Sequence, residues 1–163
     1  MGKYWVDVIF VLSFGKPSTC KANWQIAKMA VESAKGILPV VVDSCVKIEG
    51  DYVFNVGSVD EEVHEATTTL IKEFLCLCRK NGWKNILVIT ADPYSKRVVR
   101  DIRKLGKNIP INARALRTDK YYWFYPDSNQ IWTSEEYLWK IREWILMNLM
   151  TFRFYMWFTK KFA

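Results

Sequence analysis

Histidine is almost absent from this chain, and its scarcity excludes several kinds of chemistry. His64 is the only histidine among 163 residues, so no Ser–His–Asp or Cys–His arrangement is readable. The four cysteines, Cys20, Cys45, Cys76 and Cys78, do not follow the spacing of zinc ligands. The sequence therefore predicts no metal site and identifies no catalytic residue.

Cysteine is also too sparse for a disulfide framework. Four cysteines in a chain of this length favour a reducing compartment. The apolar run within "MGKYWVDVIFVLSFGKP" is interrupted by Asp7, which makes it a poor signal peptide and too short to span a membrane. We therefore expect a cytoplasmic protein. Peripheral contact with the inner membrane is an alternative that depends on the C-terminal helix.

Strand patterns alternate with helix patterns along most of the chain. Half of the residues are hydrophobic and 15% are aromatic, which is enough for a substantial core. The alternation predicts a single α/β domain over residues 1–163, Rossmann-like, with three layers (α/β/α) and a mainly parallel sheet of about four to five strands. Strands are predicted at 6–14, 37–43, 84–90 and 110–116, with a short extra strand at 51–56, and helices at 23–35, 60–82, 93–105 and from about 134.

The loops after the first two strands offer groups that recognise a phosphorylated or nucleotide-like ligand. In "SFGKPST", Ser13 supplies a hydroxyl, Gly15 lets the backbone approach a phosphate, and Lys16 supplies a cation. This loop matches neither G-x-G-x-x-G nor the Walker pattern, so an ordinary strand–helix connection is the alternative. Asp43 is a candidate acceptor for a ribose hydroxyl, or else a turn residue or cap. Right-handed crossovers bring these loops to the carboxyl edge of the sheet, where ligands of such folds bind.

The stretch "ITADPYSKRVVRDIRKLG", residues 89–106, joins a strand to a helix with cations in its first turns. Asp92 is expected to cap this helix. Lys96 and Arg97 lie near its N-terminus, where the helix dipole disfavours positive charge, so we expect Arg97 to face an anion. The residues of this stretch expected to border the carboxyl edge are Thr90, Asp92, Tyr94, Lys96 and Arg97.

The acidic start of the helix predicted at 60–82 is one internal source of such an anion. Glu61, Glu62 and Glu65 are expected in its first turn, where the dipole favours carboxylates. They either complement the dipole and face solvent, or supply a carboxylate to the cations of residues 89–106.

The formal net charge of +7 arises in one stretch of the chain. Residues 84–120 hold ten Lys and Arg against three Asp, whereas the remainder balances fourteen basic with fourteen acidic residues. This surplus predicts an anionic small molecule as a partner, or a solvated face with no partner. Nucleic acid ranks below these, because no nucleic-acid motif is recognisable; its stacking surfaces would be Tyr121, Tyr122, Trp123 and Phe124.

The strand and helix around residues 89–106 resemble part of the YdcF/SanA/ElyC-like family of bacterial proteins. That family typically has a strand ending in V-T-S, then a His, and an Arg three positions later. Thr90 and Arg97 match this pattern, whereas Tyr94 stands where the family has His. "VLSF" followed by Gly15 resembles the first strand and glycine loop of the family, with other glycines lost.

Further motifs of the same family occur in order along the chain. "DEEVHEA" resembles its Thr-x-x-Glu/Asn-Ala segment at Glu65, and "DSC" stands at its Ser-Gly-Gly segment, with Ser44 as the matching residue. The resemblance implies a Rossmann-like domain with charged residues at the strand edge, S-adenosylmethionine or another nucleotide as the ligand, and a link to cell-envelope processes. It implies no particular reaction.

The C-terminal tail, residues 144–163, is apolar on almost every side. A helix of this kind must be buried on several sides. Arg153 would lie in the middle of a membrane span, which disfavours insertion. We expect the tail to contact a membrane surface or a second subunit, making the protein an interaction module or homo-oligomer; the alternative is that its first part covers the sheet.

Overall fold

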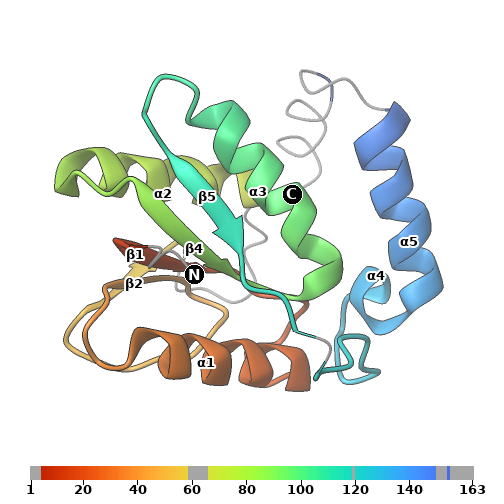
Figure 1. The fold of residues 1–163 in the computed structure, drawn as a ribbon. Helices are drawn as coiled ribbons and strands as arrows, with labels where there is room; N and C mark the ends of the chain where they lie inside the picture. The colour runs from red at the N-terminus through yellow and green to blue at the C-terminus, as the bar shows by residue number, and fades with distance from the viewer. Residues whose placement is uncertain (1–4, 59–65, 119, 150–153, 155–163) are drawn as a thin grey trace.

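A sheet of five parallel strands determines the architecture (Figure 1). The computed structural model describes residues 5–58, 66–118, 120–149 and 154. The strand order is β3-β2-β1-β4-β5, and each neighbouring pair is parallel, which confirms the predicted Rossmann-like α/β fold. The strands are β1 (Val8–Val11), β2 (Val40–Asp43), β3 (Val53–Val56), β4 (Asn85–Ile89) and β5 (Asn112–Ala115).

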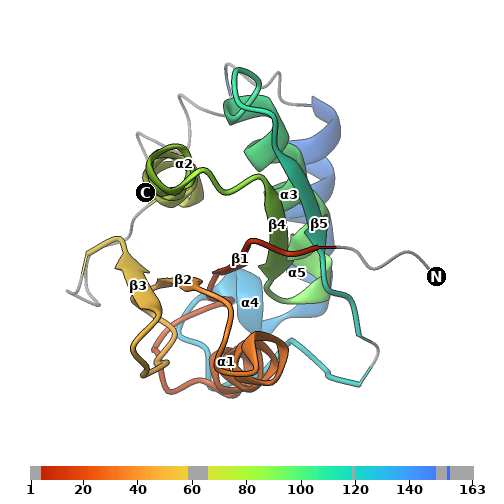
Figure 2. The same ribbon diagram turned by 60° about the vertical axis from the view of Figure 1, so that its left-hand side comes forward.

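Helices cover both faces of this sheet. Figures 1 and 2 show α1 on one face and α2 with α3 on the other, while α5 stands beside α3. A single π-helical turn, Ile145–Leu149, continues α5. The helices are α1 (Lys21–Ala34), α2 (Thr67–Asn81), α3 (Asp92–Leu105), α4 (Ile131–Ser134) and α5 (Glu136–Trp144).

The central strand β1 is the centre of the core. All four of its residues are fully buried, as expected for a parallel strand covered on both faces. Phe10 of β1 stacks on Phe74 of α2 with ring centroids 4.0 Å apart. This contact fixes α2 against the middle of the sheet.

Two predicted helix starts are wrong. Asp92 does not cap α3, because the capping position is Ala91 and Asp92 is already helical. The Asp92 carboxylate instead accepts hydrogen bonds from the backbone N–H of Thr118, at 3.3 and 3.2 Å. Helix α2 begins at Thr67 after the extended residue Ala66, so no acidic residue lies in its first turn.

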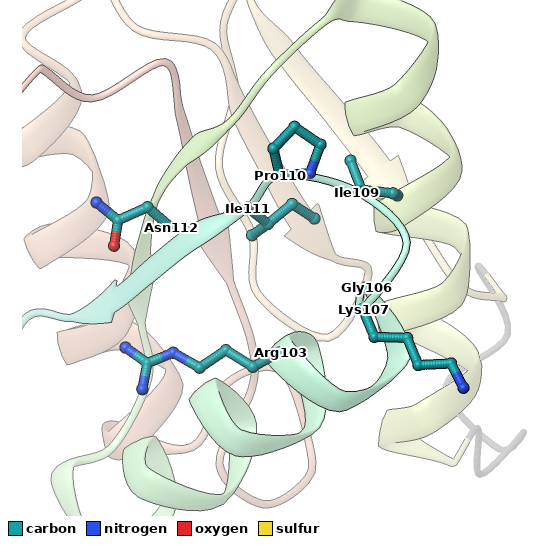
Figure 3. Close-up of a pocket in the computed structure, with 7 residues that line it drawn as sticks. All are labelled: Arg103, Gly106, Lys107, Ile109, Pro110, Ile111 and Asn112. Atoms are coloured by element: carbon teal, nitrogen blue, oxygen red, sulfur yellow. The ribbon is translucent and has the colours of Figure 1, made fainter.

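The outer edge of the sheet is covered by a basic side chain. Arg103 of α3 donates from its guanidinium to the carbonyl of Ala113 on the edge strand β5, at 2.8 Å. This carbonyl points away from β4, and its engagement protects the edge from pairing with another strand. An adjacent pocket of about 390 Å³ lies at the amino end of β5 (Figure 3). Its lining residues are Arg103, Gly106, Lys107, Ile109, Pro110, Ile111 and Asn112.

No helix within the described ranges combines the length and apolar composition needed to cross a membrane. Most of the tail at 144–163 lies outside the described residues, so its predicted association stays a prediction. The C-terminal helix itself was predicted from about residue 134, and α5 begins at Glu136.

The Phe10–Phe74 stack predicts a large effect of truncation. Phe74→Ala should lower the free energy of unfolding by about 3–5 kcal/mol, because it leaves a cavity beside the fully buried β1. Phe54→Ala is the matched control, since Phe54 is 40% exposed and should cost about 1 kcal/mol. Urea unfolding of both variants measures the difference, and equal losses would contradict a core centred on β1.

Candidate functional site

The strand order places a crevice at the carboxyl ends of β1 and β4. These neighbours lead into α1 and α3, which lie on opposite faces of the sheet. The connecting loops therefore diverge between the two strands. Ligands of open α/β sheets bind at such a switch in strand order, so this is the candidate site.

A buried asparagine holds the loop after β1. Asn23 of α1 is fully buried and accepts a hydrogen bond from the N–H of Phe14 at 2.8 Å. Its amide nitrogen donates to the carbonyls of Gly15 at 3.0 Å and Pro17 at 3.2 Å. These bonds satisfy polar backbone groups of the loop, and they fix its position beside the crevice.

Asp43 and Ser44 have partners within the protein. The Asp43 carboxylate accepts hydrogen bonds from the Ser13 hydroxyl and from the N–H of Cys45, the latter at 3.1 Å. The Ser44 hydroxyl donates to the carbonyl of Ser58. The structure thus brings Ser13 and Asp43 together as predicted neighbours, in a contact that ties the loops after β1 and β2 to each other.

The predicted phosphate loop contacts the segment before α5. Gly15 has a left-handed φ of +91°, and a Cβ there would come within 2.5 Å of Ser128 Oγ and 2.7 Å of Thr133 Oγ1. The N–H of Asn129 donates to the carbonyl of Lys16 at 2.7 Å. Gly15 is therefore required for close packing of residues 128–133 on this loop.

Four aromatic rings gather over the crevice. Phe14, from the loop after β1, lies 4.6 Å from Trp139 of α5 and 5.6 Å from Phe124, between ring centroids. Tyr94 of α3 lies 5.7 Å from Trp139. Trp123 and Phe124 are buried, so their predicted role as exposed stacking surfaces for nucleic acid is wrong. Both side chains are part of the hydrophobic core.

Arg97 faces a carboxylate from α5. Its Nε donates to both carboxylate oxygens of Glu143, at 2.9 and 3.1 Å. The guanidinium carbon lies 4.5 Å from the ring centroid of Tyr94 and 5.9 Å from that of Trp139, and Arg97 is only 3% exposed. An anion at the helix N-terminus was predicted, and the protein supplies one itself.

Burial alters the acid–base behaviour of this cluster. It raises the pKa of the Glu143 carboxyl above its ordinary value, although the nearby Arg97 and Arg142 oppose the rise. Burial also raises the pKa of Tyr94, whose hydroxyl shares a hydrogen bond with Thr67. Tyr94 is therefore neutral at physiological pH.

A second carboxylate lies at the N-terminus of α1. Asp127 accepts a hydrogen bond from the N–H of Lys21, the first residue of α1, at 2.8 Å. Sequence reasoning missed both Asp127 and Glu143. The available signal was weak: each is an acidic residue in an aromatic stretch, and neither lies near its partner in the sequence.

Two buried polar atoms at the crevice have no hydrogen-bond partner among the described residues. They are the hydroxyl of Thr90, which directly follows β4, and the indole nitrogen of Trp139. Thr90 is fully buried, so an unmet hydroxyl there is costly unless something else binds it. Glu65, the remaining predicted site residue, lies outside the described residues. Within the described ranges, no three His, Cys, Asp or Glu side chains gather as a metal site would require.

No family model, curated protein or solved structure matches this chain. The geometry of the site is therefore the basis for assigning a function.

The Asn23 contacts predict a strong dependence of stability on this side chain. Asn23→Ala should cost about 2–3 kcal/mol, because it removes the side-chain partner of the buried Phe14 N–H and of the Gly15 carbonyl. Asn81→Ala, at an exposed site with one hydrogen bond to Leu77, should cost less than about 0.5 kcal/mol. Urea midpoints of the two variants test this, and a small loss for Asn23→Ala would mean that the loop holds its shape by other contacts.

Proposed function

We propose that this protein binds a nucleotide-like or phosphorylated small molecule at the carboxyl edge of β1 and β4. The observation that carries the proposal is Arg97, a buried arginine beside the switch in strand order. A buried guanidinium requires a negative partner, which is Glu143 in this structure, and the same group binds phosphate as well as carboxylate through paired hydrogen bonds. The protein is proposed as a binder, and no reaction is assigned to it.

Other groups at the edge support the same ligand class. The Thr90 hydroxyl has an unmet hydrogen-bonding capacity, and the N-terminus of α1 accommodates a carboxylate of the protein, which supports an anionic ligand at this edge. Ser13, Gly15, Lys16, Asp43 and Ser44 would act mainly by fixing the surrounding loops, since each meets other parts of the protein.

The resemblance to the YdcF/SanA/ElyC-like family is part of this proposal. Two of its matching residues, Thr90 and Arg97, are the two that support the proposed site most directly. The same resemblance adds S-adenosylmethionine or another nucleotide to the ligands worth testing, and a role in cell-envelope processes.

A second candidate function is self-association through α5. Its outer side exposes Tyr137 by 71% and Trp144 by 58%, and neighbouring Ile141 is also exposed. Large exposed apolar side chains of this kind often mark a protein–protein interface. This candidate describes a non-enzymatic interaction module, and it is tested by measuring molecular mass in solution for the wild type and for Trp144→Gln.

The ligand-binding proposal is tested with AMP and adenosine, which differ by one phosphate. AMP should bind and adenosine should bind at least tenfold more weakly. Arg97→Lys should weaken AMP binding by about 1.5–3 kcal/mol, because lysine keeps the charge and loses the paired hydrogen bonds. Isothermal titration on variants checked for folding measures both effects.

Arg103→Lys is the matched control, since Arg103 lies at the far end of α3 on the β5 edge. Its affinity for AMP should equal that of the wild type. Equal binding of AMP and adenosine, or equal losses in the two lysine variants, would contradict a phosphate site at Arg97.

A further inference from the structure

The carboxylates that meet the two anion-binding groups of the edge come from one continuous segment. Asp127 and Glu143 begin and end residues 127–143, which we call the acidic cap. Between them, Asn129 binds the carbonyl of Lys16, and Trp139 packs on Phe14. One segment therefore covers the loop after β1, the start of α1 and the start of α3.

We infer that the acidic cap is an internal occupant of the site, which an anionic ligand must displace to reach Arg97. This inference rests on the proposed function and concerns the regulation of the same site. Both Glu143 oxygens lie within hydrogen-bond distance of Arg97 Nε, so an incoming phosphate or sulfate competes with them directly. A binding protein that is mostly closed shows an affinity reduced by its open fraction.

The packing of the cap is suited to release. Its hydrogen bond to α1, from the N–H of Lys21 to Asp127, is exposed to solvent, whereas its contacts with the β1 loop at Lys16 and Gly15 are buried. Its deepest anchor, Trp139, is buried with an indole N–H that has no partner among the described residues. Removing that ring from the crevice therefore relieves a desolvated donor while it costs apolar contacts.

Acid should favour release as well. The charged and titratable groups around Glu143 are Tyr94, Arg97 and Arg100 from α3 and Arg142 from α5. Burial raises the pKa of Glu143, so its proton is taken up at a higher pH than that of an ordinary glutamate. Protonation removes the negative charge that competes for Arg97. Binding of an anion should thus strengthen as the pH falls through this raised pKa.

Glu143→Gln tests the inference because it keeps the shape of the side chain and removes its charge. The probe is inorganic sulfate, whose charge is constant between pH 5 and 8. Glu143→Gln should bind sulfate about tenfold more tightly than the wild type at pH 8, and its affinity should vary less with pH. Glu136→Gln is the control, since Glu136 pairs with Lys140 on the exposed side of α5 and should leave sulfate affinity unchanged.

Hydrogen exchange provides the second measurement. Sulfate should increase amide exchange over residues 136–144 of the wild-type protein. Asp127→Asn replaces Glu143→Gln if the latter does not fold, and it should also tighten sulfate binding.

The outcomes separate this inference from the proposed function. If the wild type binds sulfate and AMP, yet neither cap variant binds more tightly and exchange over 136–144 stays constant, the displacement is wrong and the proposed function stands. If no form of the protein binds sulfate or AMP, the proposed function fails, and the acidic cap is then a permanent part of the fold.

Discussion

The complete burial of β1 is the constraint on which the rest of the structure depends. A strand of Val, Ile and Phe with no exposed surface needs neighbours on both sides and helices on both faces. These demands place β2 and β4 beside it, with α1 on one face and α2 on the other (Figure 1). Polar side chains are therefore accommodated at the ends of the strands, where the candidate site lies.

At that edge, charge is balanced within the chain. Arg97 meets Glu143 and the N-terminus of α1 meets Asp127, while the rings of Tyr94 and Trp139 pack beside the Arg97 guanidinium. Removing one partner of a buried ion pair is costly because it leaves an unpaired buried charge, so the Arg97–Glu143 pair holds α5 against α3. An ion pair of this kind provides two defined states if a ligand supplies the second anion. The proposed function and the proposed displacement both depend on that exchange.

Local signals predicted much of the fold. The buried strand residues, the helical spacing of apolar residues and the turn at Gly82 were sufficient to indicate the elements and their parallel arrangement. Helix starts were predicted less well. Asp92 accepts a hydrogen bond from the distant Thr118 N–H and does not cap α3, and α2 begins late because Ala66 is extended. The aromatic stretch at 121–125 was ambiguous, since apolar rings suit either a core or a stacking surface.

By itself, the sequence determined the alternation of strands and helices, the carboxyl edge as the place for polar groups, and the need of Arg97 for a negative partner. These follow from periodicity and from the helix dipole, which act over a few residues. Only the tertiary structure decided that Glu143, 46 residues away, is that partner, and that Asp127 meets α1 across 106 residues. Such pairings depend on how distant segments pack, because a charge acts on whatever the fold brings within a few ångströms of it.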